Sequence, residues 1–143
     1  MEMESVLDFC TSELEISTAR ALPDTRENKI NLAIALVGSQ KTNEIEEGTA
    51  LLEQIMKETT RGDDARICVH YLALAHARLQ NYDKSLSLLN SLLRTEPSNM
   101  QAKGLRNVVE KRMKREGLLG MGLVGGAAVL IGGIVIAGMT LKK

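Results

Sequence analysis

Aromatic side chains are scarce in this chain of 143 residues, which has no tryptophan, one phenylalanine and two tyrosines. Surfaces that bind single-stranded nucleic acid stack bases on aromatic rings, so this scarcity argues against nucleic acid as a partner. Proline is limited to two residues, and no segment shows the alternating pattern of a β-strand. The sequence therefore predicts an all-α fold.

Cysteine is also rare, and the two thiols, Cys10 and Cys68, are widely separated in the sequence. In a domain that faces the cytosol we expect free, reduced thiols rather than a disulfide. His70 and His76 lie six residues apart on one predicted helix, which places them on different faces and excludes a shared local metal site. No serine nucleophile elbow, phosphate loop, Cys-His spacing or zinc signature occurs. The sequence predicts no enzyme, no cofactor and no metal.

Charge is absent from residues 117–141, a run of 25 residues that contains eight glycines. As a helix this run would extend roughly 37 Å, which is enough to cross about 30 Å of hydrocarbon. A buried core helix is the alternative, but a domain of this size could not hide 25 residues with no polar face. A dinucleotide-like glycine pattern at residues 120–125 follows no strand, so nucleotide binding is disfavoured. We predict a transmembrane tail anchor.

Basic residues flank the predicted span on both sides. Only Lys142 and Lys143 follow it, so insertion would come after translation and leave residues 1–116 in the cytosol. Basic flanks around a modestly apolar span are typical of mitochondrial outer-membrane and peroxisomal anchors. Gly122 and Gly126 form a small-xxx-small pair that would bring two anchors together in a homo-oligomer. The upstream cations are Lys111, Arg112, Lys114 and Arg115.

Residues 1–99, the body, are acidic overall, whereas residues 100–143, which include the basic neck before the span, are basic overall. Residues 1–99 have 10 basic and 16 acidic side chains, whereas residues 100–143 have 8 basic and 2 acidic ones. An acidic body stays away from an anionic leaflet while a basic neck approaches it. The first ten residues lack the apolar run of a signal peptide. This asymmetry supports a membrane-anchored cytosolic domain.

Apolar periodicity and capping residues predict six helices in this domain. The first would present one stripe containing Val6, Phe9, Cys10 and Leu14. Asp24, Asn43 and Ser98 are the expected N-caps of the second, third and sixth helices. The expected helices cover residues 5–20, 24–38, 43–58, 63–79, 82–94 and 100–116.

The chain contains an internal repeat. Residues 48–57 align with residues 85–94, and residues 32–35 align with residues 72–75, so two helical hairpins are copies of one unit. The second copy fits the tetratricopeptide spacing, with Tyr82 at the turn aromatic and Pro97 at the terminal proline. Such hairpins stack, and their first helices line a shared concave surface. The predicted fold is a six-helix bundle with two tetratricopeptide-like hairpins and one C-terminal transmembrane helix.

The concave surface is the predicted partner groove. We expect Ile34 and Leu74, which occupy equivalent places in the two copies, to face solvent there. An apolar groove suits a hydrophobic helix or an extended arm. The predicted groove residues are Ile30, Ile34, Val37, His70, Leu74 and Ala77.

Several motifs resemble the mitochondrial fission 1 protein family of tail-anchored, tetratricopeptide-like proteins. The most specific is the run Glu96-Pro97-x-Asn99-x-Gln101-Ala102-Lys103, which is followed by the glycine-rich anchor. Others are Tyr71-Leu72-Ala73 and Arg78-Leu79-x-x-Tyr82. Leu32 stands where tyrosine is common in the family, and Ala75-His76-Ala77 replaces glycine-asparagine-tyrosine. These departures indicate a divergent paralogue.

The resemblance implies an adaptor that recruits a dynamin-related GTPase, directly or through other adaptors, for mitochondrial and peroxisomal fission. It also implies a concave groove that an N-terminal arm can occupy. A docking module for another helical partner or a chaperone is the second hypothesis. An apoptosis-regulator bundle is disfavoured because its signature contains tryptophan. The predicted organisation is an N-terminal arm or helix at 1–29, a tetratricopeptide-like domain with a capping helix at 30–116, the anchor at 117–141 and a basic tip at 142–143.

Overall fold

Six α-helices follow one another in a computed structural model that describes residues 7, 10–58 and 62–117. The predicted number of helices and the all-α class are confirmed for this part of the chain. The predicted span, the residue pair Gly122 and Gly126, and the basic tip lie outside the described residues. The helices are α1 Glu13–Arg20, α2 Arg26–Val37, α3 Thr42–Glu58, α4 Gly62–Arg78, α5 Tyr82–Thr95 and α6 Met100–Arg115.

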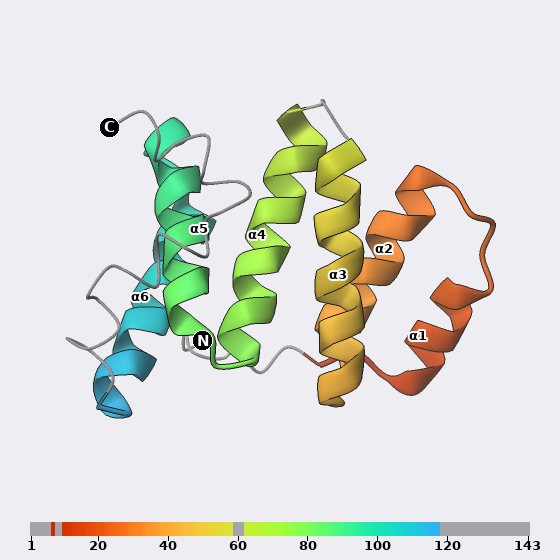
Figure 1. Cartoon of the computed structure of the whole chain (residues 1–143), viewed down its shortest axis with the longest axis horizontal. Helices are drawn as coiled ribbons and strands as arrows, with labels where there is room; N and C mark the ends of the chain where they lie inside the picture. The colour runs from red at the N-terminus through yellow and green to blue at the C-terminus, as the bar shows by residue number, and fades with distance from the viewer. Residues whose placement is uncertain (1–6, 8–9, 59–61, 118–143) are drawn as a thin grey trace.

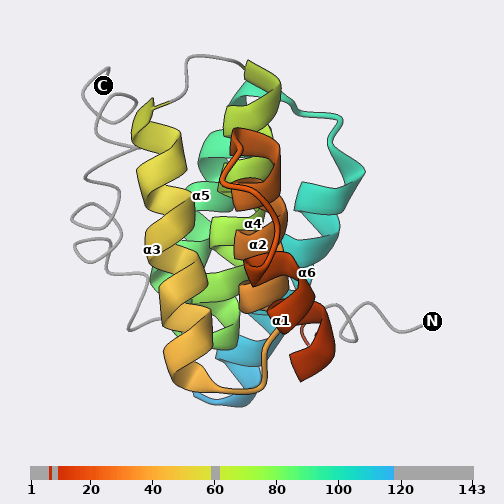
Figure 2. The same cartoon turned by 90° about the vertical axis from the view of Figure 1, so that its right-hand side faces the viewer.

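Neighbouring helices in the sequence pack side by side to form a row from α1 to α6 (Figure 1). Seen along this row, α3 and α5 lie on one side and α2 and α6 lie on the other (Figure 2). The first helix of each hairpin also contacts the first helix of the next unit, because α4 packs on both α2 and α6. This is the stacking expected of tetratricopeptide hairpins.

Small residues allow the two helices of each hairpin to approach closely. Gly48 of α3 lies so near α2 that an added Cβ would be 2.9 Å from the carbonyl oxygen of Ala33. At the equivalent place in the second hairpin, the buried Ser85 hydroxyl donates a 2.8 Å hydrogen bond to the carbonyl of Ala73. Gln80 takes a φ of 65° in the tight turn that joins α4 to α5.

The first helix is shorter than predicted. It begins at Glu13, where the Ser12 hydroxyl accepts a hydrogen bond from Glu15 N, rather than near residue 5. The predicted apolar stripe is wrong at Cys10 and Leu14, which are exposed, whereas Ile16 is the buried residue of α1. A local polar cap thus decided the start of the helix against apolar periodicity. Val6 and Phe9 lie outside the described residues.

None of the three predicted N-caps is the observed one, and two of them are displaced by one residue. Thr25 rather than Asp24 caps α2, since its hydroxyl accepts a hydrogen bond from Asn28 N. Asn99 rather than Ser98 caps α6 by accepting one from Ala102 N. Asn43 lies inside α3, which begins at Thr42. Thr25 and Asn99 have the same capping chemistry as the predicted Asp24 and Ser98, so the sequence alone does not choose between such neighbours.

The predicted domain boundary between residues 29 and 30 falls inside α2.

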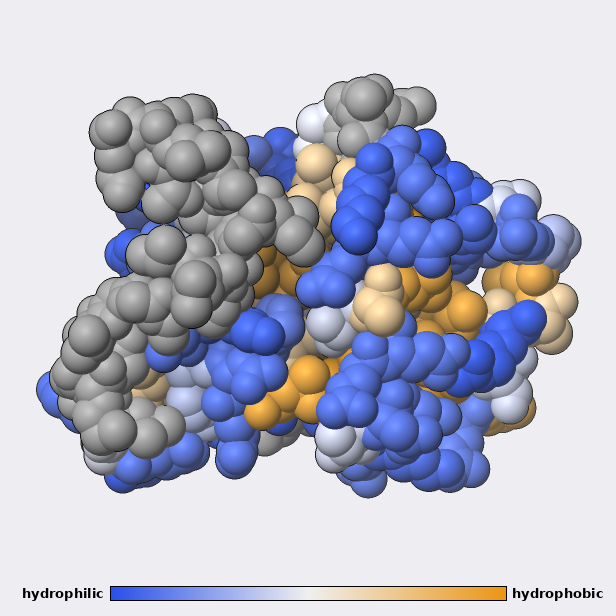
Figure 3. Space-filling model, viewed as in Figure 1, coloured by the Kyte–Doolittle hydropathy of each residue, from blue (hydrophilic) through white to orange (hydrophobic). Residues whose placement is uncertain are grey.

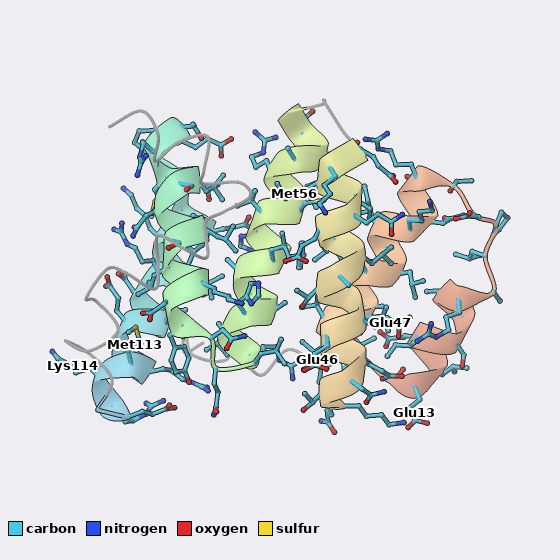
Figure 4. The ribbon with its side chains drawn as sticks, viewed as in Figure 1. Glu13, Glu46, Glu47, Met56, Met113 and Lys114 are labelled. Carbon is cyan, nitrogen blue, oxygen red and sulfur yellow. The ribbon has the colours of Figure 1, made fainter. Side chains whose placement is uncertain are left out.

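The outer surface over α3 is mainly hydrophilic (Figure 3). Glu47 projects from α3 toward α1, where its carboxylate accepts hydrogen bonds of 2.8 and 2.7 Å from Arg20 (Figure 4). Both partners are nearly half exposed, so the pair orients α1 more than it stabilises the fold. Cys10 and Cys68 are free thiols, as predicted.

Candidate partner-binding site

A hollow of about 540 Å³ opens where α2, α4 and α6 share one face of the row. The four residues from α4 are spaced so that they project from neighbouring positions of one helical surface. Glu96 and Asn99 are the C-cap of α5 and the N-cap of α6, so they close the end of the hollow. The hollow is lined by Ile34, Arg66, Ile67, His70, Tyr71, Glu96, Asn99 and Gln101.

The wall formed by α2 and α4 is mainly apolar. Ile34 is partly buried, and Ile67 is one of the exposed large hydrophobic side chains of the described chain, at 38% exposure. The rings of His70 and Tyr71 meet edge to face at 5.2 Å. Burial lowers the pKa of His70, which keeps the ring neutral near pH 7. This wall therefore offers apolar contact without charge.

An ion pair forms part of the lining of the hollow. Arg66 lies 3.0 Å from the Glu96 carboxylate and 2.8 Å from Asp63. The hydrogen bond from Arg66 and a further one from Asn99 hold the pKa of Glu96 below its usual value. Arg66 and Glu96 also line a second hollow of about 300 Å³ between α4 and α5. The pair thus stands between two neighbouring depressions.

The structure divides the six predicted groove residues into two groups. Ile34 and His70 line the hollow, as an accessible groove requires. The expectation of a solvent-facing side chain is not met for Leu74, which is 3% exposed and belongs to the core. Ile30, Val37 and Ala77 are buried as well. A role for any of the six in binding a partner stays a prediction.

The sequence reading missed Ile67 and Tyr71 because it placed the accessible part of α4 too close to its C-terminus. Ile67 lies three residues before His70 and four before Tyr71, so all three reach the hollow from neighbouring positions of α4. It also missed the polar end formed by Glu96, Asn99 and Gln101. These residues belong to the connection between α5 and α6, and only the stacking of α6 on α4 brings them to the hollow.

Leu7 lies against the C-terminal ends of α2 and α4. The Arg78 guanidinium donates hydrogen bonds to the carbonyls of Leu7 at 3.2 Å, Val37 at 2.6 Å and Ser39 at 2.7 Å. Thr11 N donates to the Gly38 carbonyl at 2.7 Å. Leu7 is 4% exposed and joins the core cluster that contains Val37 and Leu74. Leu7 therefore covers the C-terminal ends of α2 and α4, whereas the hollow near Arg66 stays open.

The upstream basic residues lie on the last turns of α6. Lys111, Lys114 and Arg115 are exposed, and Arg112 is half-buried. Lys142 and Lys143 lie outside the described residues. Among the helices from α1 to α6, none is long and apolar enough to span a membrane. Within residues 7, 10–58 and 62–117, no three His, Cys, Asp or Glu side chains are grouped to hold a metal.

Comparison with known proteins agrees with this architecture. The Fis1 N-terminal tetratricopeptide repeat matches residues 27–59, and the Fis1 C-terminal tetratricopeptide repeat matches residues 66–118. The FIS1-related protein fis-1 of Caenorhabditis elegans is 62% identical over 143 residues, and the match covers the full length of both proteins. The human mitochondrial fission 1 protein is 34% identical over 144 residues, covering 99% of this chain and 94% of the relative.

Solved structures show the same fold. Yeast Fis1, crystallised in complex with an Mdv1 fragment containing N-terminal extension and coiled coil domains, superposes with a TM-score of 0.71. The two chains are 22% identical, and the match covers 82% of this chain and 95% of the yeast chain. With two repeat units matched in order and relatives that are 62% and 35% identical over at least 94% of their length, this chain belongs to the Fis1 family.

Proposed function

We propose that this protein is a tail-anchored adaptor of the mitochondrial outer membrane that recruits a dynamin-related GTPase, directly or through adaptors, for mitochondrial and peroxisomal fission. Members of the Fis1 family are mitochondrial fission adaptors and not enzymes, and the homologues associate with mitochondria. The recruiting surface is the hollow between α2, α4 and α6. The anchor is the uncharged segment 117–141, with the cytosolic domain before it.

The observation that carries this proposal is the apolar wall of Ile34, Ile67 and Tyr71, which remains open beside a buried core. Burying one aliphatic side chain contributes about 1.5–3 kcal/mol to binding. A partner helix or an extended arm with apolar side chains would fill such a wall. The yeast relative in complex with Mdv1 supports a partner that contains helical segments.

The polar end of the hollow disfavours the alternative, a chaperone-type docking module. Such modules hold an acidic peptide tail with unpaired cations. Arg66 is the basic residue lining the described hollow, and it is already paired with Asp63 and Glu96. An incoming carboxylate would have to compete with two carboxylates already in place. We therefore assign the hollow to an apolar partner segment.

The test is Ile34→Asp in cells that lack the endogenous protein. A charge placed in the apolar wall should weaken partner binding more than tenfold, so recruitment of the division GTPase falls and the mitochondria elongate. Ala50→Asp is the matched control, because Ala50 is exposed on α3, away from the residues that line the hollow. Normal recruitment by a folded Ile34→Asp variant would contradict the assignment of this surface.

A further inference from the structure

The last helix of the domain ends in a defined turn. Glu116 N donates to the Arg112 carbonyl at 2.9 Å, and Gly117 N donates to the Lys114 carbonyl at 3.1 Å. Gly117 has a φ of +74°. A right-handed helix needs a φ near −63°, so α6 cannot continue through this residue. The domain therefore stops at Gly117, immediately before the uncharged segment 118–141.

The residue before that turn is fixed to the body of the protein. The Tyr82 hydroxyl donates a 3.0 Å hydrogen bond to Glu116 Oε2, and Tyr82 itself is only 3% exposed. Met113, one turn earlier on α6, is 1% exposed. Met113 and Lys114 lie on the last turns of α6, at the same end of the bundle as the first turn of α5 (Figure 4). The chain is thus held to the body up to Glu116 and adopts a left-handed backbone conformation at Gly117.

We propose that Tyr82, Glu116 and Gly117 form a joint that fixes the orientation of the domain relative to the segment that follows it. The tyrosine and the carboxylate fix the last turn of α6, and the glycine supplies the backbone conformation that redirects the chain. The membrane part of this inference rests on the proposed tail anchor. The joint itself rests only on residues of the described domain.

Orientation matters because of where the hollow lies. Asn99, at its polar end, caps the start of α6, and the joint lies at the other end of the same helix. A helix of 16 residues spans about 24 Å, so the joint and the polar end of the hollow are separated by about that distance along α6. A change of direction at Gly117 would move the hollow relative to the bilayer surface. The joint therefore decides whether the partner face is presented to the cytosol.

The chain offers a variant that changes only the backbone preference of the joint. A Cβ at Gly117 would meet nothing within 4 Å, so Gly117→Ala introduces no clash. Alanine disfavours the left-handed conformation, which should shift the local population toward right-handed geometry by roughly 5- to 30-fold. Gly62→Ala is the matched control, since Gly62 also has open space but no positive φ. Tyr82→Phe removes the hydroxyl that holds Glu116.

The experiment uses the full chain in liposomes that contain acceptor-labelled lipid. Cys10 is the exposed thiol, and burial raises the pKa of the Cys68 thiol to about 11, so a fluorophore reacts selectively at Cys10. Energy transfer reports the distance from the domain to the bilayer. We expect Gly117→Ala to shift this distance, Tyr82→Phe to broaden its distribution, and Gly62→Ala to change neither. An unchanged distribution in both joint variants would overturn the proposal.

A second measurement is independent of the membrane. Amide hydrogen exchange of the full chain in detergent should slow by roughly 5- to 30-fold just after position 117 in Gly117→Ala, because the helix can then continue. Unchanged exchange there would also contradict the joint. Flotation of the liposomes tests the anchor separately. A chain that does not float contradicts the proposed anchor, and the exchange result then decides the joint alone.

Discussion

The Ser85 hydroxyl donates a 2.8 Å hydrogen bond to the carbonyl of Ala73, a contact that ties the second helix of one hairpin to the first. The first hairpin has the same contact in another form, because Gly48 packs against the carbonyl of Ala33 with no side chain between them. Ala33 and Ala73 are equivalent in the two copies, as are Gly48 and Ser85. The hairpins therefore share one packing contact with two different chemical solutions.

Gly48→Ala should destabilise the domain. A Cβ there would lie 2.9 Å from both the Ala33 carbonyl oxygen and the Leu36 Cβ, and overpacking of this kind costs about 1–3 kcal/mol. The better helix propensity of alanine offsets about 1 kcal/mol of that cost. Urea unfolding followed by circular dichroism measures the difference. Gly62→Ala should leave the midpoint nearly unchanged, and a stabilised Gly48→Ala variant would contradict the close approach of α2 and α3.

Leu74→Asp should lower the stability of the domain more than Ile34→Asp does. The two residues are equivalent in the repeat, but Leu74 is buried and Ile34 lines the open hollow. An unpaired carboxylate at Leu74 should cost several kcal/mol of stability, and one at Ile34 considerably less. Thermal unfolding of both variants measures this. Equal losses would mean that Ile34 is as much a core residue as Leu74.

The domain should lose stability below about pH 6.5. His76 is 7% exposed, and its Nδ1 has no hydrogen-bond partner in the described part of the chain. Burial, with a smaller effect from Lys84, lowers the pKa of His76 to about 4. The unfolded chain therefore binds more protons between pH 6.5 and 4, and stability falls by up to ~3 kcal/mol as the pH falls through this range.

His76→Gln removes this titrating group. The variant should therefore show a flatter dependence of unfolding free energy on pH between 6.5 and 4. His70, whose pKa burial also lowers, acts in the same direction and accounts for part of the slope that remains. The measurement is urea unfolding at several pH values. A slope identical to that of the unchanged protein would show that His76 does not control the acid response.

A chain that stops after Glu116 should be folded and soluble. It keeps all six helices and the Tyr82–Glu116 hydrogen bond but loses the uncharged segment. We expect helical circular dichroism and release from membranes in an alkaline carbonate wash. Retention of this fragment in the membrane pellet would show that another part of the chain binds the bilayer.

Neutral residues at Lys142 and Lys143 should redirect part of the protein to the endoplasmic reticulum. Removing the two charges hardly changes the energy of inserting 25 uncharged residues, but it removes the basic tip that mitochondrial anchors carry. Fluorescence microscopy of the tagged protein measures the distribution. Unchanged mitochondrial targeting would assign the address to the upstream cations from Lys111 to Arg115.

Much of the architecture follows from local chemistry. The six helices were predictable because apolar periodicity and capping side chains act within a few residues. The repeat was visible because its two copies keep similar residues at equivalent positions. The start of α1 was not predictable, since Ser12 offers a cap that competes with an apolar stripe reaching back to Val6. The end of α6 was predictable, since the expected helix ended at Glu116, which is the observed C-cap. The left-handed backbone of Gly117 was not predicted.

By itself the sequence determined which side chains share a helical face, but only the tertiary structure decided which of them are accessible. Ile34 and Leu74 show the difference, since the repeat makes them equivalent and the fold does not. Leu74 belongs to the core cluster that also contains Leu7 and Val37, whereas Ile34 is only partly buried against that cluster. Leu74 is therefore buried and Ile34 lines the hollow, because burial depends on neighbours that are distant in the sequence.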